Sequence, residues 1–220
     1  MLAHDLISDS IPPLRTSDTV QKVIDRMAEF RVYHLPIVNE KQILGLICEE
    51  DLVEITDYDI EIGNLSLSLR NYWVYEDQHV YDVIRLINEL RLSLIPVLNR
   101  TKEYLGVVSL GTITEYFASL TSVKEPGTII VLEISNRDNS LAHVAQIVES
   151  ENAQILSSYV RSFPDSTKLE LTLKLNRTKT SAIVASLLRY DYAVIATFND
   201  QKSDEGSQDR YDQLMNYLDI

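Results

Sequence analysis

The sequence predicts an α+β protein in which one helix-and-hairpin unit is used twice and is followed by a separate β-α-β-β-α-β domain. The stretch 31–52 returns in closely similar form at 91–113, with Pro36 and Pro96 lying 60 positions apart. In each copy an apolar pattern of helical period precedes this stretch, whereas the residues beyond 126 carry the patterns of strands and short helices. Internal repeats of this length determine the architecture of a chain.

Composition and charge limit the class of protein. The chain has 220 residues, of which 45% are hydrophobic, and only 6 Gly and 6 Pro, which is typical of globular domains. Its formal net charge of −13 would repel a phosphate backbone, so we expect no nucleic-acid partner. The single cysteine excludes an intrachain disulfide and fits a reducing compartment. Because the start resembles no signal peptide and no apolar run reaches spanning length, we expect a cytoplasmic protein that binds no membrane.

The first copy begins with a helix expected over about Val20–Phe30. Good N-cap residue types at 17–19 precede it, and its apolar residues recur at i, i+3, i+4 and i+7. An apolar run at 35–38, a polar turn at 39–42 and a second apolar run then predict a β-hairpin. Because proline lacks an N–H, we expect Pro36 to open its strand or to face no neighbouring strand, which would leave backbone polar groups beside a cleft.

The second copy repeats these elements with one inserted residue in its turn at 99–103. Its helix is expected from Val80 to Leu90, with Asp77 as a possible cap. The aromatic cluster 72–75 aligns with residues 12–15 and is expected to be the first strand of this copy, buried or in a dimer contact; stacking on an adenine is the alternative.

The copies differ where the chain leaves each hairpin. The first copy has Glu49, Glu50 and Asp51, which suit the positive end of a helix that begins there. The second copy reads Ser109-Leu110-Gly111-Thr112 and has no acid. The apolar positions agree, whereas the polar positions have diverged.

The ordered set of helix, h-P-h-h strand, turn, G-h-h strand and T/S-x-x-D helix start, found twice, resembles a tandem pair of CBS domains over residues 1 to about 122. The resemblance implies two repeats that pack by their strands around two clefts, and modules that commonly form flat dimers. In that family the clefts often bind adenosine-containing ligands. Candidate ligands are AMP, ATP, S-adenosylmethionine and NAD.

The same resemblance implies which residues line the clefts. In the family the Asp of T/S-x-x-D accepts hydrogen bonds from ribose hydroxyls, and the Thr or Ser contacts phosphate. The first copy has Asp51 but Cys48 in place of the hydroxyl, and the second has Ser109 but Thr112 in place of the acid. The implied ligand-binding residues are His34, Leu35, Pro36, Cys48, Asp51, Ile95, Pro96, Ser109 and Thr112. The structural alternatives are a helix-stabilising role for Asp51, core packing for Cys48 and a structural histidine at position 34.

After a linker at 123–126, the pattern predicts strands at 128–134, 155–160, 168–175 and 193–198. The apolar residues between 141 and 148 and between 180 and 189 predict two helices. This β-α-β-β-α-β order is the ferredoxin-like arrangement. The strand KLELTLKL alternates polar and apolar residues, so we expect one of its faces to meet solvent.

Two short stretches of this domain resemble degenerate signatures of ACT domains, a family of small effector-binding regulators. They are 136–141 and 151–155, and the implied effector loop is Asp138, Asn139 and Ser140. Asn139 and Asn152 stand where the family has glycine, and asparagine tolerates the left-handed backbone better than most residues. The order of CBS pair and ACT domain resembles that of regulators associated with acetoin utilisation.

The expected domains are the first repeat at 1–62, the second at 63–125, the ACT-like domain at 126–199 and an acidic tail with a short amphipathic helix at 200–220. No Walker loop, Rossmann fingerprint or G-x-S-x-G motif occurs, and no histidine has a metal ligand at suitable spacing. We therefore expect no catalysis, no metal and no required cofactor. The expected function is that of a homodimeric sensor that binds a small effector and acts on a regulated protein. The alternative is a ligandless assembly module.

Overall fold

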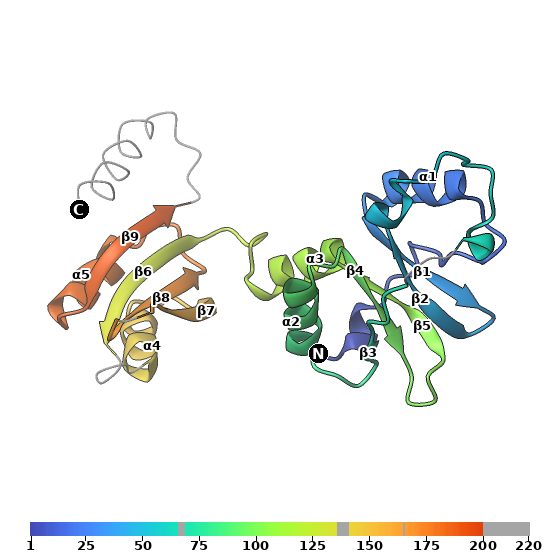
Figure 1. The fold of residues 1–220 in the computed structure, drawn as a ribbon. Helices are drawn as coiled ribbons and strands as arrows, with labels where there is room; N and C mark the ends of the chain where they lie inside the picture. The colour runs from blue at the N-terminus through green and yellow to red at the C-terminus, as the bar shows by residue number, and fades with distance from the viewer. Residues whose placement is uncertain (66–68, 136–140, 165, 200–220) are drawn as a thin grey trace. The chain divides into compact units, whose positions relative to one another are not determined.

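A computed structural model describes residues 1–65, 69–135, 141–164 and 166–199 (Figure 1). It divides into two compact units, Met1–Tyr116 and Phe117–Ile220, and each unit has its own hydrophobic core. Within the described ranges, no helix has the length and apolar character needed to cross a membrane.

The first unit repeats one order of elements, and its hairpins are antiparallel, as predicted. The second hairpin also carries a short parallel strand on its outer side. With η denoting a 3₁₀ helix, the elements are η1 (Ala3–Leu6), α1 (Val20–Phe30), β1 (His34–Asn39), β2 (Gln42–Cys48), η2 (Glu49–Leu52), η3 (Ile62–Asn64), β3 (Val74–Tyr75), α2 (Val80–Leu90), β4 (Leu94–Leu98), β5 (Tyr104–Ser109) and α3 (Leu110–Leu120), which extends past the end of the unit.

Helices α1 and α2 have the predicted bounds and similar ends. The Oγ1 atom of Thr19 accepts a hydrogen bond from the N–H of Lys22 and caps α1. For α2 the prediction of an Asp77 cap is wrong, because the cap is Nδ1 of His79, which accepts from the N–H of Tyr81. The Asp77 carboxylate instead binds Arg100.

The prolines lie inside their strands, so the first of the two positions expected for Pro36, the start of its strand, is wrong. Pro36 is the third residue of β1 and pairs with Leu46 of β2. The N–H of Leu46 points away from β1, toward the carbonyl of Arg70, so this pair exchanges no hydrogen bonds and needs no N–H from proline. The carbonyl of Pro36 accepts from the N–H of Leu14 at 2.8 Å and is therefore used in the sheet.

The prediction that residues 72–75 align with residues 12–15 is confirmed. Leu14 pairs in parallel with Ile37 of β1, and Val74 of β3 pairs in parallel with Val97 of β4. Val74 and Val97 lie 60 positions after Leu14 and Ile37, so the two copies use equivalent residues for the same contact.

Each hairpin is flanked by the arm that leads into the other repeat. The N–H of Ser8 donates to the carbonyl of Val107 on β5, and Arg70 exchanges two backbone hydrogen bonds with Leu46 on β2. The arms approach so closely that each hairpin has a glycine beneath the crossing. A Cβ on Gly45 would lie 2.6 Å from the Cβ of Leu69.

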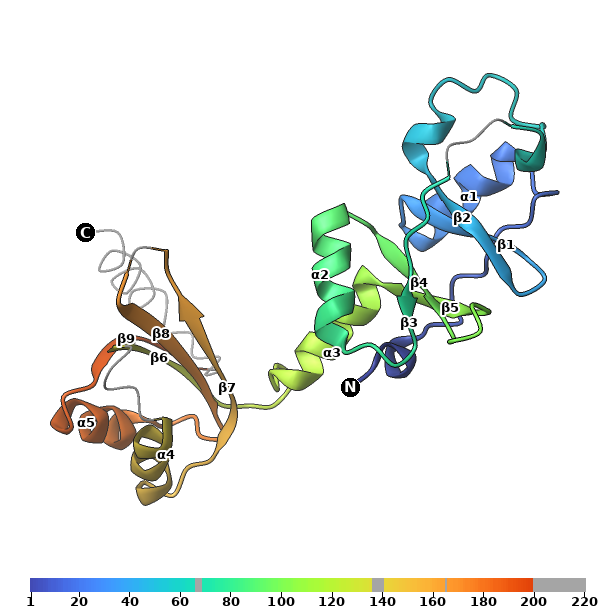
Figure 2. The ribbon, with the colours of Figure 1, turned by 60° about the horizontal axis from the view of Figure 1, so that its bottom comes forward.

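The second unit has the predicted ferredoxin-like topology. Its antiparallel sheet has the order β7-β8-β6-β9, and α4 and α5 lie on one face (Figure 2). The elements are β6 (Thr128–Ser135), α4 (Leu141–Ser150), β7 (Ile155–Ser162), β8 (Lys168–Leu175), α5 (Ser181–Arg189) and β9 (Ala193–Asn199).

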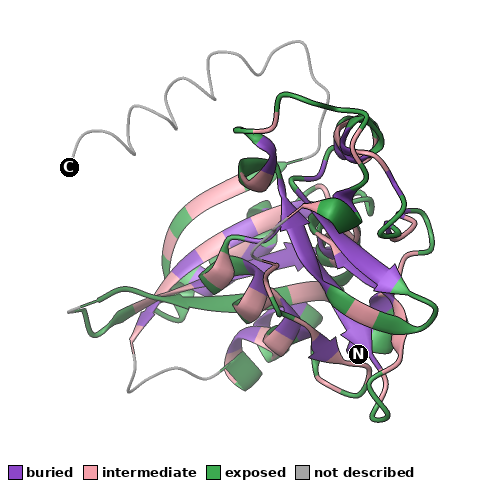
Figure 3. Cartoon of the chain, turned by 45° about the vertical axis from the view of Figure 1, so that its right-hand side comes forward, coloured by how far each residue is buried: buried purple, intermediate pink, exposed green. Residues whose placement is uncertain are grey.

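The expectation of a solvent-facing side along β8 is wrong for the second half of that strand. Thr172 and Lys174 have only 7% exposure each, and the buried residues continue to the end of the strand. Figure 3 shows buried residues in purple, many of them on strands, and exposed residues in green along the loops. A Cβ added to Gly127, which lies just before β6, would be 3.5 Å from Cε of Lys174, so the segment that leads into β6 lies against this end of β8.

The expected left-handed backbone at Asn152 is confirmed, with φ of 55°. The carbonyl of this residue accepts two hydrogen bonds from the Arg177 guanidinium, which hold the turn. The implied effector loop of Asp138, Asn139 and Ser140 and the tail at 200–220 lie outside the described residues.

Candidate functional site

The two repeats meet around a local pseudo-twofold axis. At one end of the hairpins the backbone N–H groups of Tyr33 and His34 donate to Oγ of Ser93, at 3.0 and 3.1 Å. At the other end Gln42 pairs with Glu103. Positions 33 and 93, and positions 42 and 103, are equivalent in the repeat, so contacts between equivalent positions mark the axis.

The residues that the resemblance implies for the first cleft gather where β2 ends. The N–H of Cys48 donates to Oδ2 of Asp51 at 2.8 Å, while the Cys48 thiol accepts from the N–H of Glu50. These two bonds close a cap on η2 and explain why Cys48 is buried and why Asp51 faces back toward the hairpin. The predicted helix at the acids is therefore only one 3₁₀ turn, whereas the equivalent segment of the second repeat is α3, with eleven residues.

Arg70 completes this group of polar side chains. Its guanidinium binds Oδ2 of Asp51 and Oε2 of Glu50, both at 3.2 Å. The Asp51 side chain is 17% exposed and that of Arg70 is 30% exposed, so the pair is partly shielded from water. Burial opposes the charged form of Arg70, but nearby Cys48, Asp51 and Glu50 raise the pKa of the guanidinium above its ordinary value.

Sequence reasoning missed Arg70 because it lies on the arm of the second repeat, far in sequence from Asp51. One signal was present. Arg70 is the only lysine or arginine between Gln42 and Ile84, in a stretch rich in acids. A single cation in such a stretch has many possible carboxylate partners, and the backbone pairing of Arg70 with Leu46 selects those of η2.

His34 lies beside this charged group and is buried. The Nδ1 atom of its ring accepts a hydrogen bond from the N–H of Ser93 at 3.3 Å and lies 3.2 Å from Oγ of Ser93. Since Oγ already accepts two backbone N–H groups, its own hydrogen points to Nδ1, and the network assigns the neutral ring with its proton on Nε2. Burial and the Arg70 charge lower the pKa of His34, and Glu50 and Asp51 only partly oppose them.

The second candidate cleft contains no charged group at the equivalent positions. Oγ of Ser109 lies 3.0 Å from Oγ1 of Thr112 and accepts from the N–H of Thr112 at 3.1 Å. These hydroxyls therefore satisfy one another at the start of α3. Of the other predicted site residues, the four apolar ones are buried in the sheets: Leu35, Pro36, Ile95 and Pro96.

The helices of the first unit carry two apolar grooves related by the same repeat. Each groove lies between the helix before a hairpin and the helical segment after it. The grooves have volumes of about 570 Å³ and about 450 Å³, and both include Tyr33, which is 63% exposed. The first is lined by Ile24, Met27, Ala28, Arg31, Val32, Tyr33, Glu49, Leu52 and Val53, and the second by Tyr33, Ile84, Ile87, Asn88, Arg91, Leu92, Ser93, Leu110 and Ile113.

Among the described residues, no group of histidine, cysteine and carboxylate side chains is arranged to hold a metal ion.

Comparison with known proteins supports the interpretation of the repeat. The family model for the CBS domain matches residues 3–57 and 66–119. Similar solved structures include a CBS domain pair/ACT domain protein from Thermotoga maritima, with 22% identity over 54% of this chain and 98% of that one and a TM-score of 0.48. The CBSX2 protein in complex with AMP has 17% identity, covers 54% and 96%, and has a TM-score of 0.46.

A third similar structure is a CBS domain pair in complex with 5'-methylthioadenosine and S-adenosyl-L-methionine. It has 21% identity over 54% of this chain and 97% of that one, and a TM-score of 0.43. The assignment rests on the sequence match, which covers both copies of the repeat and ends close to the limits of the hairpins and helices described above. The chain therefore belongs to the proteins that carry a tandem pair of CBS domains, which here are residues 3–57 and 66–119.

Proposed function

We propose that this protein is a non-catalytic, cytoplasmic regulatory sensor that binds an adenosine-containing ligand in the cleft at Asp51 and passes the change through a homodimer to a regulated protein. The observation that carries the proposal is the Asp51–Arg70 pair in a CBS domain pair. A carboxylate accepts hydrogen bonds from ribose hydroxyls, and a guanidinium binds phosphate through two parallel hydrogen bonds. Both groups are present in one cleft and absent from the equivalent positions of the other.

Ligand binding exchanges one partner of Arg70 for another. Without ligand the guanidinium neutralises Asp51 and Glu50. A nucleotide phosphate competes for that guanidinium, and the Asp51 oxygen that it releases becomes free for a ribose hydroxyl. Because Arg70 is held on β2 by two backbone hydrogen bonds with Leu46, a shift of its side chain strains the arm between the repeats. This is the proposed route from the cleft to the rest of the module.

Dimer formation is proposed through the two apolar grooves. They are equivalent in the repeat and adjoin at Tyr33, so together they form one face with internal twofold character. A face of this kind is suited to an isologous interface, in which the same patch is buried on both subunits. Its exposed apolar side chains include Tyr33, Val53 and Leu110.

A thermal-shift panel of AMP, ATP, S-adenosylmethionine and NAD on the full chain tests the sensor. Ligand at about 100 times its dissociation constant stabilises the folded state by about 2.7 kcal/mol. We expect at least one of the four to raise the melting temperature. Asp51→Ala should make the binding free energy of that ligand less favourable by about 1.5–3 kcal/mol, because one charge-assisted hydrogen bond is lost.

Thr112→Ala is the matched control in the other cleft and should leave the affinity unchanged. If Thr112→Ala loses affinity and Asp51→Ala does not, the ligand binds in the cleft of the second repeat, which contradicts the proposal. No shift at millimolar concentrations of all four ligands would reject an adenosine sensor and leave the second candidate, a ligandless assembly module. That candidate is favoured by one specific observation, the mutual pairing of Ser109 and Thr112.

A further inference from the structure

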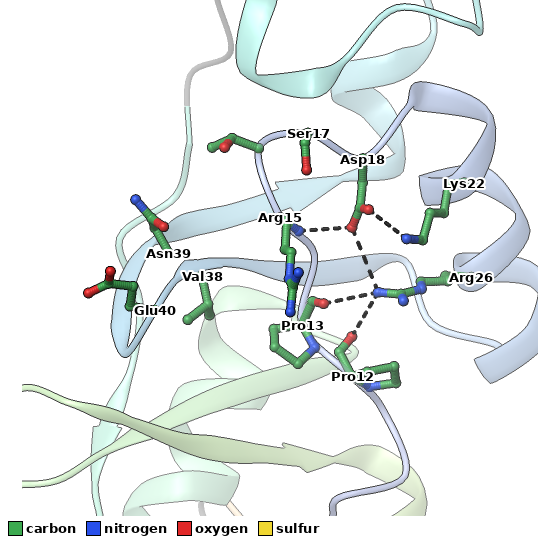
Figure 4. A pocket seen from close by; sticks show the side chains of 11 residues that line it. Pro12, Pro13, Arg15, Ser17, Asp18, Lys22, Arg26, Val38, Asn39 and Glu40 are labelled. Atoms are coloured by element: carbon green, nitrogen blue, oxygen red, sulfur yellow. Dashed lines mark hydrogen bonds and ion pairs between the residues drawn. The ribbon is translucent and has the colours of Figure 1, made fainter.

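A polar pocket of about 720 Å³ lies at the outer corner of the first repeat, away from the Asp51 cleft (Figure 4). It is enclosed by the segment before α1, by the first turns of α1 and by the tip of the β1–β2 hairpin. Its lining residues are Pro12, Pro13, Arg15, Thr16, Ser17, Asp18, Lys22, Arg26, Val38, Asn39 and Glu40. Pockets of this volume accommodate small molecules, and the polar lining favours a polar one.

Cationic side chains gather around a buried carboxylate on one wall. Asp18, 7% exposed, accepts from the N–H of Arg15 at 2.9 Å and binds Nζ of Lys22 at 2.6 Å, and Nη1 of Arg26 lies 4.0 Å away. Arg26 is held in place by the carbonyl of Pro13 at 2.9 Å. With these charges and hydrogen bonds, the pKa of Asp18 lies below its ordinary value although burial opposes the shift.

The Arg15 guanidinium is the group that this network does not use. Only the backbone of Arg15 contacts Asp18, and within the described ranges its guanidinium has no hydrogen bond or ion pair. Figure 4 shows it between the Lys22 and Arg26 wall and the hairpin tip that carries Asn39 and Glu40. An unpaired guanidinium in a concave site presents a planar fork of donors that matches a carboxylate or a phosphate.

The second repeat provides an internal comparison, because its equivalent corner is filled by its own side chains. Arg100 stands at the position of Glu40, and its guanidinium binds Oδ2 of Asp77 at 2.6 and 3.0 Å. It also stacks over Tyr75, which stands at the position of Arg15, with 4.7 Å between the guanidinium carbon and the ring centre. The backbone is the same, since the N–H of Tyr75 donates to Gln78 as that of Arg15 does to Asp18. The first repeat thus keeps the scaffold but lacks the ion pair that fills the corner.

We propose that this pocket, defined here as the Arg15 corner, binds a small organic anion. The carboxylate or phosphate of the ligand binds the Arg15 guanidinium and the free N–H groups of Lys22. Hydroxyl groups of the ligand donate to Glu40 and to the side-chain oxygen of Asn39. The first-turn N–H groups of α1 take no part, since those of Val20 and Gln21 are already bound to carbonyls of residues 60 and 58.

The net charge of the Arg15 corner favours a ligand of negative charge. Three cations and two carboxylates leave one net positive charge in the pocket of a chain whose net charge is −13. A cationic ligand would face Arg15, Lys22 and Arg26 together, whereas an anion with neutral hydroxyls meets complementary groups on both walls.

The test is an NMR titration of the full chain, in which backbone amide shifts report where a probe binds. The probes are glycerol 3-phosphate and malate, with glycerol as the uncharged control, at constant ionic strength. We expect at least one anion to shift the amides of residues 15–18 and 38–40, and glycerol to leave them in place. If neither anion shifts these amides at millimolar concentrations, the proposal is overturned.

Variants separate this site from a general attraction of anions. Arg15→Gln should weaken the bound probe about tenfold, since it removes a charge-assisted contact, and Arg85→Gln on the exposed face of α2 should have no effect. Equal weakening by both variants would overturn the proposal.

The double variant Ser17→Asp with Glu40→Arg transplants the ion pair of the second repeat into the corner. Because the new ion pair fills the pocket, this variant should abolish binding even though it raises the net charge of the corner by one. Unchanged dispersion of the amide spectrum would show that the variant is folded. Retained affinity in this folded double variant would contradict the proposal. Asp51→Ala leaves the corner intact, so the result is independent of the adenosine cleft.

Discussion

His34 shows how one buried side chain makes the stability of the first unit depend on pH. Its Nδ1 accepts from Ser93, and its pKa lies below the ordinary value of 6.5 because of burial and Arg70. Protonation would place a hydrogen on Nδ1, which could then no longer accept the hydrogen bond from the N–H of Ser93. The folded state therefore binds this proton less readily than the unfolded state does.

The sign of the effect follows from the lowered pKa. The contribution of neutral His34 to the free energy of unfolding is complete above 6.5 and decreases as the pH falls toward the folded-state pKa. We expect the stability measured by urea unfolding to fall as the pH is lowered below 6.5. His34→Asn keeps an acceptor near the same place and should flatten this decrease, whereas His4→Asn, at an exposed position, should not. An unchanged slope in His34→Asn would contradict the assignment.

Tyr104 is a second residue whose polar group is costly in the folded state. Its hydroxyl is buried and has no hydrogen-bond partner among the described residues. Burial, with a contribution from Asp9, raises the pKa of this phenol well above its ordinary value, so it remains neutral. A buried donor without a partner costs about 1–3 kcal/mol.

Tyr104→Phe should therefore be neutral or should stabilise the protein, by up to about 1 kcal/mol, because the ring is kept and only the unpaired hydroxyl is removed. The measurement is the free energy of unfolding in urea of Tyr104→Phe, compared with that of Tyr116→Phe. A loss of more than about 1 kcal/mol in Tyr104→Phe would show that the hydroxyl has a partner after all.

At the scale of elements, the crossing of each arm over its hairpin depends on one glycine. Gly45 has φ of +149° and lies against Leu69, and Gly106 has φ of +153° and lies against Ile7. A side chain at either place would meet both a steric contact and an unfavourable backbone conformation. The equivalence of the two sites explains why both glycines occur in the repeat.

Gly45→Ala and Gly106→Ala should each lower the free energy of unfolding by more than about 1 kcal/mol. Gly111→Ala is the matched comparison, because Gly111 lies in α3 with no atom closer than 3.5 Å to the added carbon. Alanine is the better helix former by about 1 kcal/mol, so this variant should be neutral or stabilised. Denaturant unfolding of the three variants distinguishes these outcomes, and a destabilisation shared by all three would contradict the argument.

Helices and strands were predicted correctly where their signal is a local pattern. A helix cap and the burial of one side chain were not, because they depend on residues distant in sequence. The period of α1, the prolines and the hairpin turns are local patterns, and each gave the right element. The cap at His79 could not be read from sequence, since the side chain that seemed suited to it, Asp77, is bound to Arg100 across the corner. The burial of Lys174 likewise depends on the segment before β6, which lies against its side chain from a distant part of the sequence.

The candidate cleft shows the same division. The position of Asp51 was predicted from a repeated motif, but its partner Arg70 comes from an arm whose pairing partner is not encoded nearby. Leu35, Pro36, Ile95 and Pro96 were predicted to line the clefts; they are buried in the sheets, and their part in ligand binding stays a prediction. A family motif marks the strand that builds a site, but it does not tell which of that strand's side chains point into it.

At the scale of the whole molecule, the proposed dimer can be tested at the two grooves. Val53 is 78% exposed and lines the first groove, and Leu110 is 49% exposed and lines the second. Val53→Glu with Leu110→Glu would bury four carboxylates in a twofold interface, so we expect this variant to sediment as a monomer while the wild type sediments as a dimer. Leu44→Glu, at an exposed position of β2 outside both grooves, should remain dimeric. A monomeric wild type, or a dimer that survives the double substitution, would reject this interface.

The exchanged arms also bear on the order in which the chain can fold as it is made. The hairpin of the first repeat lacks its flanking arm until Arg70 has been synthesised, and Ser8 must wait for Val107. Neither copy can therefore close its sheet alone, although each contains a whole sequence repeat. Contacts of such long sequence separation form slowly. Ser8, which is synthesised before nearly all other residues of this unit, is therefore among the last of them to form its native contacts.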